Sequence, residues 1–167
     1  MGMIACYQMA DAEVIKALQE KDTDELFEAI EELQEEDEAV LDIDKMWDGL
    51  HFLLTGVSAT TPLEGDALSE AVVGVKMFSD EEDADFIAYT LPEKIAAIVA
   101  ALEDFDIEKA IEDFQPKVFA QKDIYPNIWM HEDKEGLQEE LEEVFQAVKD
   151  FYDNAAKQGK GVIVSIY

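Results

Sequence analysis

The apolar residues of this chain recur with two periods, one typical of strands and one typical of helices. Short apolar runs bounded by polar residues predict strands at 3–9, 75–78, 86–90 and 161–167. Apolar residues three and four positions apart predict helices at 11–21, from 23 or 24 into the acidic run 35–38, at 44–56, 66–73, 92–102, 107–114 and 134–158, with a short turn at 116–122. We expect the link 79–85 to be a hairpin loop or a bulged connection.

Helical runs interrupted by isolated strands indicate an α+β fold. We predict a single compact domain over residues 1–167, with several helices packed on a small mixed sheet that includes the N- and C-terminal strands. The segments 3–9 and 161–167 are apolar on both faces, which favours a place in the middle of the sheet. The alanine-rich helix 92–102 is apolar on most sides, so we expect it to be deeply buried.

Charge narrows the choice of partners. The chain carries 41 acidic residues against 12 basic ones, a net charge of −29, and every basic residue is lysine. Nucleic acids and anionic membranes attract basic proteins, so we expect neither as a partner and instead expect a basic protein. The longest apolar run has eight residues, too short to span a bilayer. One cysteine, Cys6, cannot form an internal disulfide, which suits a reducing cytoplasm.

The segment 41–56, LDIDKMWDGLHFLLTG, separates into two faces when it is placed on a helix. Its polar face contains Asp44, Asp48, His51 and Thr55. Asp48 is then within reach of His51, and a carboxylate that orients an imidazole supports a general base or a metal ligand. The alternative is structural, because Asp44 is well placed to cap the helix and the other residues can form a hydrogen-bonded network, the more frequent origin of such a pattern.

A second group of candidate binding residues consists of Tyr125, Trp129 and His131. An aromatic-lined loop beside a histidine can form the wall of a pocket, although tyrosine and tryptophan in such loops more often anchor the loop to the core. We expect no metal, since His51 and His131 are far apart and the acids at 80–85 lack the spacing and glycine of a calcium loop. No nucleotide-binding or serine-hydrolase motif is present, so we expect no cofactor.

Three segments of the chain carry a family resemblance. LDIDKMWDGLHFLLTG at 41–56, DIYPNIW at 123–129 and FYDNAAKQGKGVIVSIY at 151–167 resemble the YfbM-like family of bacterial proteins of unknown function, as does the MGMI start. The resemblance implies a compact α+β domain from a bacterial cytosol. It implies no activity, cofactor or catalytic residue.

Two functions are consistent with these features. The first is a non-enzymatic interaction protein whose acidic surface binds a basic partner, as an inhibitor or an immunity-type protein would. The second is a small hydrolase or ligand-binding enzyme in which His51 is the base, Asp48 orients it, and Tyr125 or Trp129 lines the cleft. The exposure of His51 distinguishes them, since a buried histidine with no cavity beside it cannot act as a base on a substrate. The sequence leaves the oligomeric state open.

Overall fold

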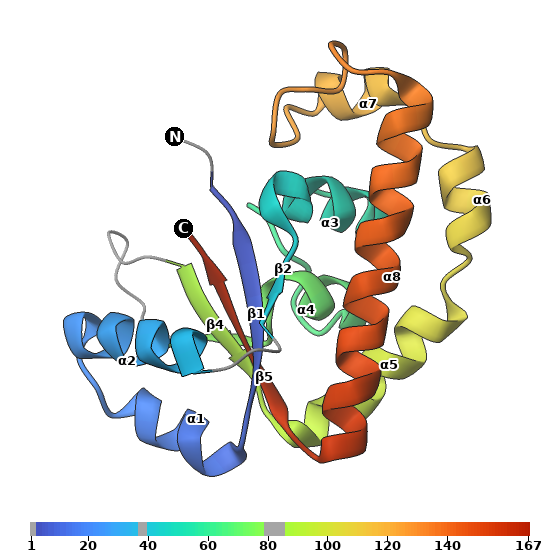
Figure 1. Cartoon of the computed structure of the whole chain (residues 1–167). Coiled ribbons are helices and arrows are strands. Elements are labelled where there is room, and N and C mark those ends of the chain that lie inside the picture. Colours follow the sequence, from blue (N-terminus) through green and yellow to red (C-terminus); the bar gives the residue numbers. More distant parts are fainter. Residues whose placement is uncertain (1–2, 37–39, 79–85) are drawn as a thin grey trace.

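The computed structural model describes residues 3–36, 40–78 and 86–167 of the chain (Figure 1). The strands are β1 (Ala5–Ala10), β2 (Leu41–Asp42), β3 (Lys76–Met77), β4 (Phe86–Thr90) and β5 (Gly161–Ile166). The helices are α1 (Ala12–Gln19), α2 (Thr23–Glu36), the 3-10 turn η1 (Asp44–Met46), α3 (Trp47–Thr55), α4 (Ala67–Val73), α5 (Pro92–Asp104), α6 (Ile107–Glu112), α7 (Pro116–Gln121) and α8 (Lys134–Gln158). The link predicted at 79–85 lies outside the described residues.

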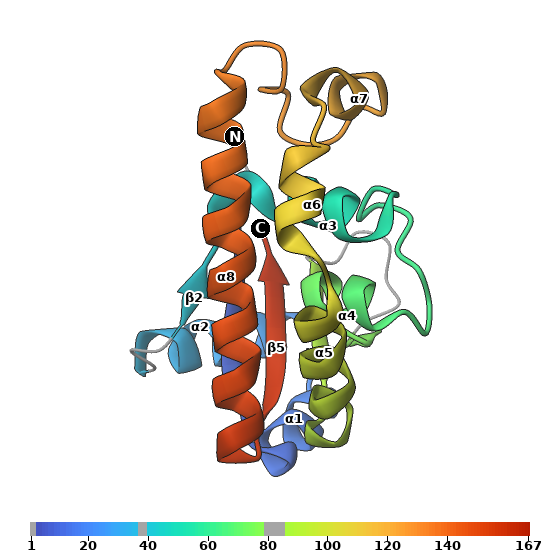
Figure 2. The same cartoon turned by 90° about the vertical axis from the view of Figure 1, so that its right-hand side faces the viewer.

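The strands form one sheet in the order β2-β1-β5-β4-β3. The prediction that the first and last strands pair near the centre is confirmed, because β5 lies between β1 and β4. The predicted mixed sheet is wrong, since every pair of neighbouring strands is antiparallel. The reason is that β1 and β4 both end where β5 begins: Ala10 is opposite Gly161, and Thr90 is opposite Val162. The helix α8 runs back along the sheet to that end (Figure 2).

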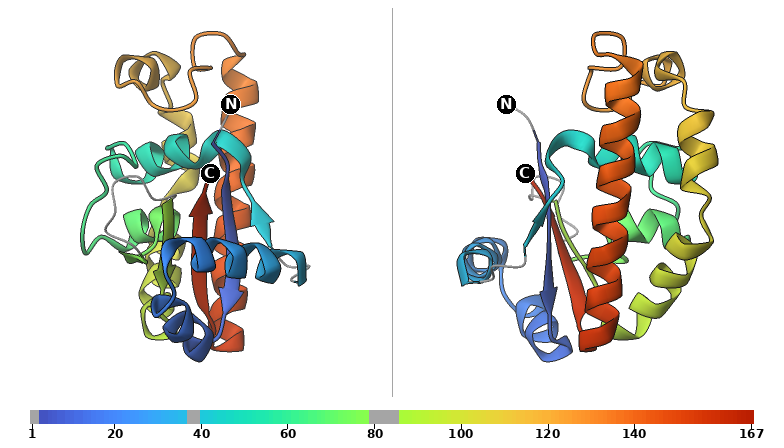
Figure 3. Two further views of the ribbon diagram at one scale, coloured as in Figure 1. Left: turned by 90° about the vertical axis from the view of Figure 1, so that its left-hand side faces the viewer. Right: turned by 45° about the vertical axis from the view of Figure 1, so that its right-hand side comes forward.

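Helices cover both faces of the sheet, which confirms the α+β prediction. On one face lie α1 and α2, and on the other lie α3, α4, α5 and α8 (Figures 1 and 3). Alternate residues of β5 serve the two layers: Val162 and Val164 pack in the core under α5 and α8, whereas Ile163 packs in the core under α1 and α2. This explains why the strand is apolar at nearly every position.

The helix α5 is less buried than its composition suggests. Its buried residues are Ile95, Ile98 and Leu102, spaced to meet the core along one side, while Ala96 and Ala97 are exposed. The predicted deep burial of the whole helix is therefore wrong. Alanine favours a helix without requiring burial, so an alanine-rich helix can keep a solvent-facing side.

Candidate functional site

The helix α3 carries the two polar residues that the sequence marks for chemistry, and both are buried. Asp48 is 1% exposed and His51 is 0% exposed. The helix ends at Gly56, whose backbone is left-handed with a φ of 81°, and whose N–H donates to the Phe52 carbonyl. The chain after this turn supplies most of the groups that contact the two side chains.

The carboxylate of Asp48 accepts hydrogen bonds from two separate loops. Its Oδ1 accepts the Ser58 hydroxyl at 2.9 Å and the Ala59 backbone N–H at 2.7 Å. Its Oδ2 accepts the Tyr125 backbone N–H at 2.9 Å. Among the contacts of the described residues there is no hydrogen bond between Asp48 and His51, so this carboxylate does not orient the imidazole directly. It joins the loop after α3 to the loop after α7.

The imidazole of His51 is fixed at both nitrogens. Its Nδ1 lies 2.8 Å from the Val57 carbonyl, which can only accept, so Nδ1 carries the proton. Its Nε2 is then the acceptor for the hydroxyl of Ser69, at 2.8 Å. Burial lowers the pKa of His51 from its ordinary value of 6.5, although the Val57 hydrogen bond and the charge of Asp48 act in the opposite direction. The buried surroundings of the ring therefore favour its neutral form.

The two ends of the predicted polar face have local roles. The Thr55 hydroxyl donates to the His51 carbonyl at 2.8 Å and accepts the Val57 N–H at 3.3 Å, so it helps to close the turn after α3. Asp44 is exposed and does not cap α3, whose N-cap is Met46. Asp44 instead begins η1, and its own N–H donates to Asp42 Oδ1 at 2.7 Å.

The second group of candidates does not form one site. Trp129 is 1% exposed and packs against Phe119, with its indole N–H donated to the Ile124 carbonyl at 2.7 Å. Tyr125 is partly buried and stacks on Trp47 with ring centroids 5.3 Å apart, whereas His131 is exposed. These positions favour the anchoring role for the two aromatic residues.

Two buried polar residues that the sequence analysis did not select have prominent positions. Ser69 is 1% exposed, bonds to His51, accepts the Leu63 N–H at 3.0 Å and lines a cavity of about 520 Å³. Gln8 in β1 is 2% exposed, lines a different cavity, and its Oε1 has no hydrogen-bond partner among the described residues. A glutamine in the middle of an apolar strand is the one signal that the sequence offered for such a residue.

Acidic side chains dominate the surface of α2. Half of its 14 residues are acidic and exposed, and the helix contains no basic residue; the acids are Asp24, Glu25, Glu28, Glu31, Glu32, Glu35 and Glu36. A second acidic region surrounds Glu140 in α8, where partial burial raises the pKa of the carboxyl and the charges of Glu132 and Asp44 raise it further. Like charges therefore accumulate at both places without local compensation.

Two classes of site are absent from the part of the chain that the structure describes. Within those residues, no three or more His, Cys, Asp or Glu side chains are grouped so that they would hold a metal ion. None of the described helices combines the length and the apolar character that crossing a membrane requires.

Comparisons with known proteins identify similar chains along nearly the whole length. A family model described as "Domain of unknown function (DUF1877)" matches residues 1–165. The chain is 37% identical over 136 residues to Protein YfbM of Escherichia coli (strain K12), covering 81% of this chain and 80% of that protein. It is also similar to the crystal structure of a protein of unknown function, YfbM from Escherichia coli, with a TM-score of 0.72, 28% identity, and coverage of 98% of this chain and 99% of that one.

Proposed function

The chain belongs to the DUF1877 family, whose function is unknown, and we propose that it is a non-enzymatic protein that binds a basic protein partner through its acidic surface. The family assignment confirms the YfbM-like resemblance of the sequence. The observation that carries the proposal is α2, in which half of the 14 residues are exposed acids with no basic residue among them.

The placement of the acids on α2 favours a function beyond solubility. Glu35 and Glu36 lie in the last turn, where the helix dipole disfavours negative charge. Repulsion between acids one turn apart adds to this penalty. These acids lower the stability of α2 when the protein is free. A cation that binds beside them would remove the repulsion and restore that stability. A basic partner would supply that charge, and the field of the whole protein would speed its approach.

The internal contacts of α3 support the same proposal. Every polar atom of the Asp48 carboxylate and of the His51 ring has a partner within the chain. Neither residue lines any of the four cavities described for the protein. A base that must accept a proton from a substrate needs a free lone pair within reach of it. The two side chains are accordingly better suited to holding loops together, and their catalytic role stays a prediction.

The proposal is tested with a labelled hexa-arginine peptide and two matched triple variants. Glu28→Gln, Glu31→Gln and Glu32→Gln together neutralise α2, whereas Glu139→Gln, Glu142→Gln and Glu143→Gln remove the same charge from exposed positions of α8. We expect the α2 variant to lose most of the affinity measured by fluorescence anisotropy, and the α8 variant to lose much less. Binding should also weaken as salt rises from about 0.05 M to about 0.3 M. Equal losses in both variants would mean that only the total charge matters.

A second candidate function has one specific observation in its favour. The Ser69 hydroxyl donates to His51 Nε2 at 2.8 Å and lies at the wall of the cavity of about 520 Å³. This is the arrangement of a serine nucleophile and its base, with the Val57 carbonyl in the place of the orienting acid. The cavity would admit a small ester. Against it, Ser69 is 1% exposed and its oxygen already accepts the Leu63 N–H.

Hydrolysis of p-nitrophenyl acetate decides this alternative. A hydrolase centred on Ser69 predicts turnover that Ser69→Ala and His51→Gln both abolish, together with labelling of Ser69 by a fluorophosphonate. Turnover that persists in Ser69→Ala, or no turnover above the uncatalysed rate, would exclude it. Ser58→Ala is the control, since it removes a nearby serine hydroxyl that bonds to Asp48 and not to His51.

The cellular location of the protein is also a proposal. We place it in the cytoplasm, because its one cysteine leaves it without an internal disulfide. Fractionation of the source cells followed by immunoblotting tests this, and recovery of the protein outside the cytoplasmic fraction would contradict it.

A further inference from the structure

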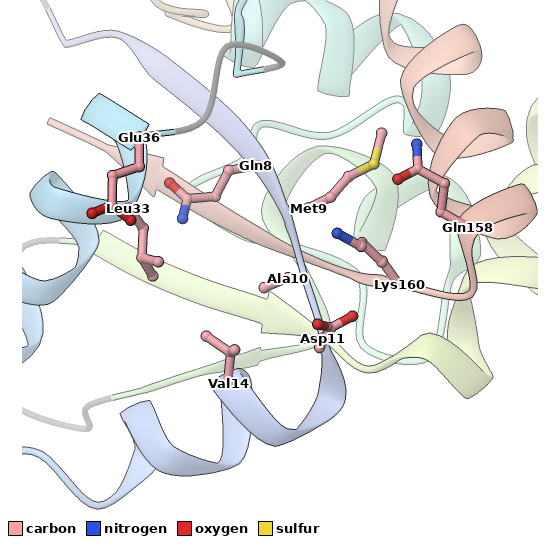
Figure 4. A pocket seen from close by; sticks show the side chains of 9 residues that line it. All are labelled: Gln8, Met9, Ala10, Asp11, Val14, Leu33, Glu36, Gln158 and Lys160. Carbon is pink, nitrogen blue, oxygen red and sulfur yellow. The ribbon is translucent and has the colours of Figure 1, made fainter.

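A cavity of about 320 Å³ lies where the end of β1 meets the start of α1 and the end of α2. Figure 4 shows the residues that line it. It adjoins the acidic helix on which the proposed function rests. Neither the network around Asp48 nor the cavity beside Ser69 shares a residue with it.

Gln8 is the unusual member of this cavity. It is opposite Ile163 in the sheet, so its side chain leaves β1 on the face that α1 and α2 cover. The residue is 2% exposed, yet its Oε1 accepts no hydrogen bond from any described residue. Buried carbonyl oxygens are nearly always paired, because leaving one unpaired lowers stability. No described residue supplies a donor to this oxygen, so at the wall of a cavity it is an acceptor that the donor group of a bound ligand can satisfy.

The surroundings of Gln8 define the chemistry of that donor. Its side chain points toward Leu33 and Glu36 of α2 (Figure 4). Val14 and Leu33 supply apolar walls, and Glu36 supplies a carboxylate. Lys160 also lines the cavity, but it approaches from the other side of β1 (Figure 4). The end beside α2 therefore combines neutral and negative acceptors with apolar walls, which suits an alkyl chain ending in a cation.

We propose that this cavity receives an arginine side chain of the basic partner, with its stem against Val14 and Leu33 and its guanidinium donating to Gln8 Oε1. Arginine fits better than lysine, because its planar fork can serve the Gln8 oxygen and the Glu36 carboxylate together. The net charge of −29 and the acids of α2 provide the charge complementarity. The inference rests on the proposed function and adds the contact that would make the binding selective.

Gln8→Leu is the decisive variant, because it removes the oxygen while keeping the net charge and the approximate size. It should fold at least as well as the native chain, since it replaces an unpaired buried polar group by an apolar one. We expect its affinity for the hexa-arginine peptide to fall about tenfold, the effect of losing a hydrogen bond to a charged donor. The exposed Gln146→Leu on α8 makes the same chemical change away from the cavity and should leave affinity unchanged.

Nuclear magnetic resonance gives an independent readout on the full chain. The side-chain amide signal of Gln8, identified by its loss in Gln8→Leu, should shift on adding hexa-arginine and shift less with hexa-lysine. If the peptide binds but neither the signal nor the affinity of Gln8→Leu changes, the cavity holds only water and this inference fails, while the proposed function survives. If the native chain binds no peptide, both fail. Butylguanidinium binding as tightly as the peptide would overturn the protein partner in favour of a small cation.

Discussion

Asp48 Oδ2 accepts the backbone N–H of Tyr125 at 2.9 Å, so that α3 holds a loop 77 positions further along the chain. The Tyr125 ring stacks on Trp47, and its hydroxyl accepts the Met3 N–H at 2.7 Å. Trp47 in turn donates its indole N–H to the Met3 carbonyl at 3.0 Å. Three distant segments are thus fastened around one buried carboxylate. Two of these segments, 41–56 and 123–129, are ones on which the family resemblance rests, and the contacts show that they meet in the fold.

Asp48→Asn should lower the free energy of unfolding by about 2 kcal/mol, because an amide cannot accept from all the donors that the carboxylate satisfies. Asp44→Asn is the matched control: it removes the same charge from an exposed position and should change stability by no more than about 0.5 kcal/mol. Urea unfolding of both variants provides the comparison. Equal free energies of unfolding for the two variants would show that the fold does not depend on the buried carboxylate.

The burial of His51 predicts a loss of stability in mild acid. The folded chain takes up a proton at His51 only below the ordinary pKa of 6.5, so the unfolded chain binds more protons in that interval. The free energy of unfolding contributed by this residue should be complete above pH 6.5, fall as the pH drops toward the lowered pKa, and become constant below it. Urea unfolding from about pH 8 to about pH 5 tests this.

The histidine controls separate this effect from other titrations. His51→Gln should remove this part of the pH dependence, while His131→Gln, at an exposed position, should retain it. The prediction fails if the free energies of unfolding of the native chain and of His51→Gln differ by the same amount at every pH. That result would mean that His51 has the same pKa in the folded and the unfolded chain.

Substituting alanine for glycine should change stability in opposite directions at two positions, Gly49 and Gly136. A Cβ on Gly49 in α3 would lie 2.5 Å from Cη2 of Trp129, inside the packed core. Gly49→Ala should therefore lower stability by about 1–3 kcal/mol, the usual effect of overpacking. A Cβ on Gly136 in α8 would meet no atom within 4 Å, and Gly136→Ala should raise stability by about 0.5–1 kcal/mol through helix propensity. Thermal melts of the two variants, followed by far-ultraviolet circular dichroism, measure the difference in sign.

The same charge change at the two ends of α2 should affect stability differently and peptide binding alike. Glu35→Lys places a cation in the last turn, and Glu25→Lys places one in the first turn. The helix dipole should make Glu35→Lys the more stable of the two by about 1 kcal/mol. Both make the same charge change, so both should weaken hexa-arginine binding to a similar degree. A loss of affinity that followed stability rather than charge would argue against the acidic surface as the binding element.

Periodicity was sufficient to predict most elements of this fold, and tertiary contacts account for what it missed. The apolar register of α8 was predictable because Leu137, Leu141 and Val148 recur on one side of an otherwise polar helix. The strand β2 was not predicted, since two residues carry no periodic signal. Sheet direction was also missed, because it depends on the end of the sheet at which the chain enters β5, which the residues of the strands do not encode.

The candidate site was harder to predict than the fold. Asp48 and His51 were correctly placed on one helix, but their partners Ser58, Tyr125 and Ser69 come from elements whose packing against α3 is not encoded in local spacing. Ser69 in particular follows the N-cap Asp66 and has no feature in the sequence that marks it. Whether such a pair is catalytic or structural depends on its contacts with distant segments. These contacts cannot be predicted from a single sequence.

The central position of β5 determines the order in which the sheet can be assembled during synthesis. β1 and β4 are made early, but they have no common neighbour until residues 161–166 have left the ribosome. Until then the two parts of the sheet expose unpaired edges, the condition that promotes association between nascent chains. A chain interrupted after α8 would keep every described helix and lack the strand that joins the two parts of the sheet. The β1-β2 and β3-β4 pairs therefore join into one sheet only after β5 has been made.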